Sequence, residues 1–87
     1  MEVFMVQRSL QGLPLEQLAA AQQRAIRTAA DMSAGGTPIR YIRTAFVPGT
    51  GQCMCLFESE RCETVEALNR QANIPFDRVV PALDLTP

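Results

Sequence analysis

Cys53 and Cys55 have the spacing in this sequence that most directly suggests chemistry, because one residue separates them within a strand-like run. Alternate side chains of a β-strand point to the same face, so both thiols lie together, with Cα atoms roughly 6.5–7 Å apart. Two thiolates are suitable ligands for zinc, copper(I) or nickel, and a second copy of the chain could supply two more. In the alternative interpretation, both cysteines are small buried apolar side chains.

Tyr41 and Arg43 form a second candidate site, because residues two apart in a strand share a face. On a face that lines a cavity, Arg43 would need an anionic ligand or a carboxylate such as Glu58 as its partner. Tyr41 could donate a hydrogen bond or act as a weak general acid. Arg8 joins this cluster if its side chain points to the same face. The alternative is a structural arginine–carboxylate pair at the rim of an interface.

The composition restricts the chemistry further. The chain of 87 residues has no histidine, so the commonest general base and the commonest metal ligand are both missing. Its net charge of −1 argues against binding to nucleic acid or to an anionic membrane. No segment is apolar for long enough to span a bilayer, and the chain opens on a strand-like run instead of a signal peptide. We therefore expect a cytoplasmic protein without a disulfide framework.

Hydrophobic periodicity predicts four strands and two helices. Apolar runs bounded by turn residues predict strands at residues 2–8, 39–47, 53–58 and 78–83. Helical spacing predicts helices at residues 15–33 and 60–73. The buried stripe of the first helix is expected to comprise Leu15, Leu18, Ala19, Ala25, Ile26, Ala29 and Ala30. Pro81 cannot donate a hydrogen bond to a sheet, so the last strand is expected at an edge or at a bulge.

The order of these elements, β-α-β-β-α-β, predicts one α+β domain of the ferredoxin-like type over residues 1–87. Right-handed crossovers place both helices on one face of a four-stranded antiparallel sheet. The other face is then uncovered, and we expect Tyr41, Ala45 and Phe57 on it. A second copy packed by two-fold symmetry is the simplest cover, which predicts a homodimer of the α+β barrel type.

Five segments carry a resemblance that covers nearly the whole chain. They are Gln7-Arg8, residues 13–18 (LPLEQL), 39–44 (IRYIRT), 55–58 (CLFE) and 72–79 (ANIPFDRV). In these segments the chain resembles a family of small bacterial proteins of uncharacterised function, one of whose members is a nickel-binding protein. The resemblance implies a ferredoxin-like fold, pairing through the sheets and a bound metal. Its histidine positions correspond to Arg43 and to the vicinity of Leu68 in this sequence, so the imidazole ligands are absent.

Three functions remain open from the sequence. The first is a small homodimeric protein that binds a metal ion or a small, anionic ligand near the open sheet face. Its candidate ligand-binding residues are Arg8, Tyr41, Arg43, Phe57 and Glu58, and its candidate metal ligands are Cys53 and Cys55. The second is a cofactor-independent enzyme of the isomerase, cyclase or monooxygenase type that uses Arg43 and Tyr41 in a cavity between sheet and helices. The third is a structural or regulatory dimer without a ligand.

Overall fold

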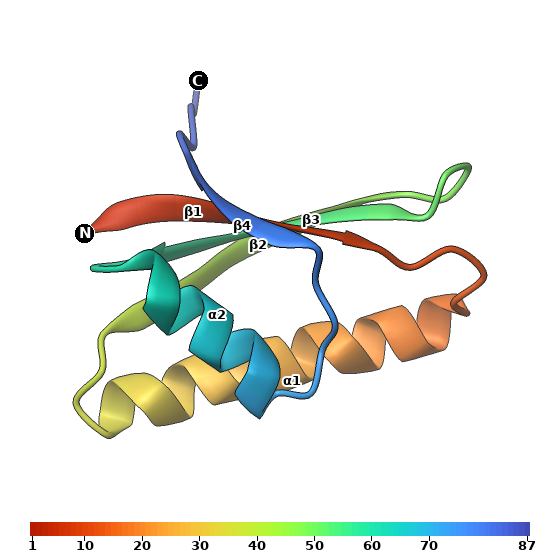
Figure 1. Cartoon of the computed structure of the whole chain (residues 1–87). Helices are drawn as coiled ribbons and strands as arrows, with labels where there is room; N and C mark the ends of the chain where they lie inside the picture. The colour runs from red at the N-terminus through yellow and green to blue at the C-terminus, as the bar shows by residue number, and fades with distance from the viewer.

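The computed structural model describes all 87 residues and has the predicted order of elements, β-α-β-β-α-β (Figure 1). The strands are β1 (Glu2–Ser9), β2 (Ile39–Val47), β3 (Gln52–Ser59) and β4 (Arg78–Ala82). The helices are α1 (Leu15–Ala34) and α2 (Cys62–Gln71). The predicted α+β, ferredoxin-like fold is therefore confirmed.

The strands form one antiparallel sheet in the order β2-β3-β1-β4. β1 lies in the centre of this sheet, which explains why the run Val3–Val6 is apolar at every position. β4 lies at an edge of the sheet, where a strand can accommodate Pro81 although proline has no backbone N–H to donate. Both helices cover the same face of the sheet, and the opposite face is open (Figure 1).

The core lies between the sheet and the two helices. Phe57, Val65 and Leu68 are fully buried there, together with Val6 of the central strand. From α1 the core receives mainly small side chains, Ala21, Ala25 and Ala29, with half-buried Leu18 and Met32 beside them. Small side chains let this helix lie close to the sheet, so few atoms separate it from the strands.

The buried stripe of α1 differs in part from the predicted one. Ala25 and Ala29 are buried and Leu18 packs against the core, as predicted. Leu15 is 74% exposed and Ile26 is 37% exposed, so the prediction is wrong for these two residues, as it is for the exposed Ala19 and Ala30. The helix is rotated so that Ala21, Ala25 and Ala29 face the sheet, because the narrow space beneath it suits small side chains better than large ones.

A β-bulge at Ile42 divides β2 into two parts. Tyr41 pairs with Phe57, whereas Arg43 pairs with Leu56, so one additional residue of β2 lies between the two pairs. An additional residue reverses the alternation of faces along the rest of a strand. Tyr41 therefore faces the helices together with Phe57, and Arg43 faces the open side.

Two predictions about faces are consequently wrong. Tyr41 and Arg43 do not share a face, because the bulge lies between them. Tyr41 and Phe57 do not lie on the open face either. Phe57 is fully buried against the helices, and the ring of Tyr41 meets it edge-on, with the ring centroids 5.5 Å apart. Ala45 does lie on the open face, where it pairs with Met54.

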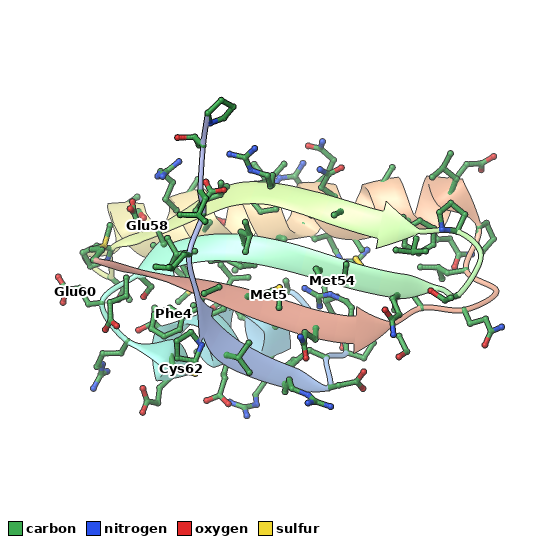
Figure 2. The ribbon with its side chains drawn as sticks, turned by 90° about the horizontal axis from the view of Figure 1, so that it is seen from above. Phe4, Met5, Met54, Glu58, Glu60 and Cys62 are labelled. Atoms are coloured by element: carbon green, nitrogen blue, oxygen red, sulfur yellow. The ribbon has the colours of Figure 1, made fainter.

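The open face has an apolar centre with charged margins (Figure 2). Its centre consists of half-buried side chains of β1, β3 and β4, namely Val3, Met5, Met54, Leu56, Val80 and Ala82. Met5 and Met54 project from neighbouring strands on this side (Figure 2). Covering by a second copy remains a prediction. Neither helix combines the length and the apolar character needed to cross a membrane.

Candidate functional site

The two thiols of β3 lie together on the helix-covered face of the sheet. Cys53 is 2% exposed and Cys55 is 6% exposed, whereas the intervening Met54 lies on the open face. The alternation of the strand places both thiols on one side, as the spacing predicts. The covered side is also the side on which α1 lies. A partner that packs against the open face therefore cannot supply additional ligands to these thiols.

Arg8 brings a positive charge into the same place. It pairs with Cys53 across β1 and β3, and only 4% of its surface is exposed. Its Nη1 donates a hydrogen bond to the carbonyl oxygen of Pro75 at 3.0 Å. No carboxylate forms an ion pair with it, because the ion pairs of the chain join other arginines to other acids. A buried cation without an acidic partner favours an anion beside it, and the cysteine sulfurs are the groups available.

A chain of side-chain hydrogen bonds leads from α1 to Cys55. Gln22 Nε2 donates to Tyr41 Oη at 2.8 Å, and Tyr41 Oη lies 2.5 Å from Thr44 Oγ1. Thr44 Oγ1 in turn lies 3.2 Å from Cys55 Sγ. Since Tyr41 Oη accepts its hydrogen bond from the Gln22 amide, the Tyr41 hydroxyl can donate to Thr44 Oγ1, and the Thr44 hydroxyl can donate to Cys55 Sγ. This arrangement supplies a donor to Cys55 and suits a negatively charged sulfur.

The two thiols have opposite pKa shifts. A hydrogen bond from Cys53, the charge of Arg8 and the hydroxyl of Thr44 together lower the pKa of Cys55 to about 5, although its burial opposes ionisation. The pKa of Cys53 is raised, because its proton is held by the hydrogen bond to Cys55 and because burial disfavours its thiolate. At neutral pH the pair therefore holds one proton, mainly on Cys53, and one negative charge, mainly on Cys55.

A small cavity adjoins these groups. Its volume is about 20 Å³, which is room for roughly one water molecule. Its polar lining comes from Arg8, Thr44, Cys53 and Cys55, together with Gln22. Ala21 and Ala25 of α1 form part of its apolar wall. The space is large enough for a single ion or a molecule of very few atoms, and too small for a metabolite.

Arg43 and Glu58 lie on the other side of the sheet and do not pair with each other. Arg43 Nη2 contacts Asp84 Oδ2 at 3.1 Å, and Arg40 Nε contacts Glu58 Oε1 at 3.2 Å. Both arginines are largely exposed, so these pairs contribute little to stability. Of the predicted ligand-binding residues, Arg8, Tyr41 and Phe57 lie beneath the helices, whereas Arg43 and Glu58 lie on the open face. Arg43 and Tyr41 therefore do not line one cavity between the sheet and the helices, as the enzyme alternative requires.

Cys62 lies apart from the other two cysteines. It begins α2, is half-buried, and its Sγ lies 3.8 Å from the carbonyl oxygen of Val79. Burial is the main cause that raises its pKa, and the charges of Glu66 and Glu63 add to this shift. Cys62 is thus an unactivated thiol in the same chain, and it provides an internal control for experiments on Cys53 and Cys55.

Thr44 and Gln22 were not identified from the sequence. Regular alternation would place Thr44 on the face opposite Tyr41, and only the bulge brings the two hydroxyls together. Gln22 lies on α1 beside the alanine stripe, where the sequence shows only one polar residue among several. No cluster of three or more histidine, cysteine, aspartate or glutamate side chains is arranged to hold a metal ion. The thiol pair is therefore a two-donor site within one chain.

Comparisons with known proteins agree on one group. A family model described as "Nickel responsive protein SCO4226-like" matches residues 4–81. No curated protein matches the chain. Among solved structures, the crystal structure of SCO4226 from Streptomyces coelicolor A3(2) superposes with a TM-score of 0.78 at 21% sequence identity. The match covers 98% of this chain and 99% of that one, so the two proteins share the whole fold.

Proposed function

Because the chain belongs to the family of nickel-responsive SCO4226-like proteins, we propose that it is a metal-binding homodimer that holds one thiophilic ion between Cys53 and Cys55 of each subunit. The observation that carries this proposal is the placement of both thiols on one covered face beside the cavity. Family membership supports a role connected with metals. The residues of this chain determine which metal chemistry is available.

The residues do not fit a nickel site built from imidazoles. The chain has no histidine, and Arg43 stands where the resemblance places one. A guanidinium cannot ligate a metal, because it remains protonated and has no acceptor atom. Arg43 is also engaged with Asp84 on the open face. The residues of this chain therefore do not fit nickel coordination in the manner expected from the resemblance.

The thiol pair favours ions that accept two sulfur ligands. Structural zinc sites are tetrahedral and need four donors, whereas this chain offers two. The thiols lie on the face that α1 covers, so a partner on the open face of the sheet supplies no further donors to them. Copper(I) is selected by soft thiolates and accepts linear coordination by a pair of them. A thiophilic ion of this type is the occupant that the donor set supports best.

The open face supports the homodimer. It presents an apolar centre with ion pairs at its margins, the common pattern of an interface with a polar rim. A domain of 87 residues buries a modest fraction of its surface alone, so covering this face would stabilise it. In this arrangement, each subunit keeps its own thiol site on the side away from the partner.

Anaerobic titration with copper(I) against a chromophoric copper(I) chelator tests the proposal. We expect one tightly bound ion per subunit, lost in Cys53→Ser and in Cys55→Ser. Cys62→Ser is the matched control, because that thiol lies outside the cavity, and it should bind like the parent protein. Absence of bound copper(I), or binding that survives the loss of both Cys53 and Cys55, would contradict the proposal.

A further inference from the structure

Arg8 is the feature of the thiol site that a metal-binding function alone does not explain. A cation beside a metal site normally weakens binding through like-charge repulsion. Arg8 is nevertheless 4% exposed, is held by the carbonyl of Pro75 and has no carboxylate partner. Burial of such a charge is costly unless neighbouring groups balance it. Its position opposite Cys53 makes it part of the total charge of the site.

We infer that Arg8 makes the thiol pair selective for monovalent thiophilic ions over divalent ones, an inference that rests on the proposed function. Arg8 does not touch the ion and acts as a specificity-determining residue through its charge. Its class of ligand is then the monovalent d10 ions, of which copper(I) and silver(I) are members.

The count of charges carries this inference. Two thiolates and one guanidinium sum to −1, so a monovalent ion makes the occupied site neutral. A divalent ion leaves one uncompensated positive charge between α1 and the sheet, beside side chains that are almost fully buried. No acidic side chain forms an ion pair with Arg8 that could offset it. Charges that are buried without compensation are strongly disfavoured, so the site discriminates by charge as well as by softness.

The size of the effect follows from the distance between the guanidinium and the sulfurs, which belong to paired residues of adjacent strands. One additional unit of charge on an ion at roughly 5 Å from the guanidinium, with an effective dielectric constant of about 20, changes the relative affinity by on the order of a few hundredfold. Removal of the guanidinium should therefore shift the ratio of monovalent to divalent binding by about this factor.

Silver(I) and cadmium(II) provide the test, because they have the same electron configuration and differ mainly in charge. Their affinities are measured by competition for the parent protein and for Arg8→Met, Arg8→Gln and Arg8→Lys. We expect the ratio of silver(I) to cadmium(II) affinity to fall by roughly a few hundredfold in the two neutral variants and to be kept in Arg8→Lys. Arg24→Met is the matched control, since Arg24 also donates to a carbonyl, that of Ala72, but does not line the cavity.

Circular dichroism and thermal unfolding identify which variants fold. The Gln amide can donate to the carbonyl of Pro75, so Arg8→Gln provides a neutral variant if Arg8→Met does not fold. A ratio that is unchanged in a folded neutral variant overturns the inference and leaves the metal-binding proposal intact. A fall in the ratio in Arg24→Met would also overturn it, because the effect would then not depend on the charge at Arg8. Failure of the parent protein to bind either ion would contradict the proposed function itself.

Discussion

Substitution of Thr44 by Val removes the hydroxyl that faces Cys55 and keeps the side-chain size. The lost contact is the 3.2 Å hydrogen bond between Thr44 Oγ1 and Cys55 Sγ, one of the causes that lower the pKa of that thiol. A hydrogen bond to a charged group is worth about 1.5–3 kcal/mol, and Thr44 is half-buried, so the lower part of this range applies. We expect the pKa of Cys55 to rise by about one pH unit.

The assay is an ultraviolet titration of thiolate absorbance in a Cys62→Ser background, in which Cys53 and Cys55 are the remaining thiols. Tyr41→Phe is the graded control, because it removes the donor to Thr44 and leaves the Thr44 hydroxyl in place. Its shift should have the same direction and a smaller size. If Thr44→Val titrates at the same pH as the parent, then the hydrogen-bond chain does not stabilise the thiolate.

The same substitution should change how stability depends on pH. The pKa of Cys55 is lower in the folded protein, about 5, than its ordinary value of 9.0. Its stabilising contribution is therefore fully present above the unfolded pKa, decreases between these two values and is lost as the pH falls through about 5. Urea unfolding should show Thr44→Val to be destabilised more at pH 8 than at pH 4. An equal loss at both pH values would refute the link between the hydroxyl and the thiolate.

Three further predictions concern other parts of the molecule. Binding of one copper(I) at pH 7 should release about one proton, measured with an indicator in weak buffer, because the pair holds a single proton; release of two would contradict this. Gly51→Ala should lower the free energy of unfolding in urea by about 1–3 kcal/mol, because Gly51 has φ 77° and an added Cβ would overlap the Cα of Gln11; an unchanged free energy would show that this turn can relax. If the chain forms the proposed homodimer, Leu56→Glu should convert it to a monomer in light scattering, because the substitution places a charge at the centre of the open face; an unchanged dimer mass would contradict pairing through this face.

The fold was predictable because its signals are local. Apolar periods of two and of three to four residues, separated by glycine- and proline-containing turns, are sufficient to give the order of strands and helices. The position of Arg8 was also within reach of this reasoning. Phe4 and Val6 alternate onto the buried face of β1, and the next residue in that alternation is Arg8. Charged side chains are rarely buried, so the sequence alone did not indicate that the alternation of buried residues continues to Arg8.

The composition of the site was less predictable because it depends on one irregularity. Strict alternation placed Tyr41 with Arg43, whereas the bulge at Ile42 joins Tyr41 to Thr44. A bulge arises from the way two strands pair, and the sequence of one strand does not announce it. Likewise, the uniform periodicity of α1 leaves its rotation open, and the space beneath it selects the alanines over Ile26.

The bulge places Tyr41 and Arg43 on opposite faces of the sheet, whereas regular alternation would place them on the same face. Beyond Ile42, the odd-numbered residues Arg43 and Ala45 belong to the open face, and Thr44 belongs to the thiol site. Mutations at the position of Arg43 can therefore alter the open face while the groups around Cys55 stay in place. The outer surface and the interior of the same strand can thus change independently of each other.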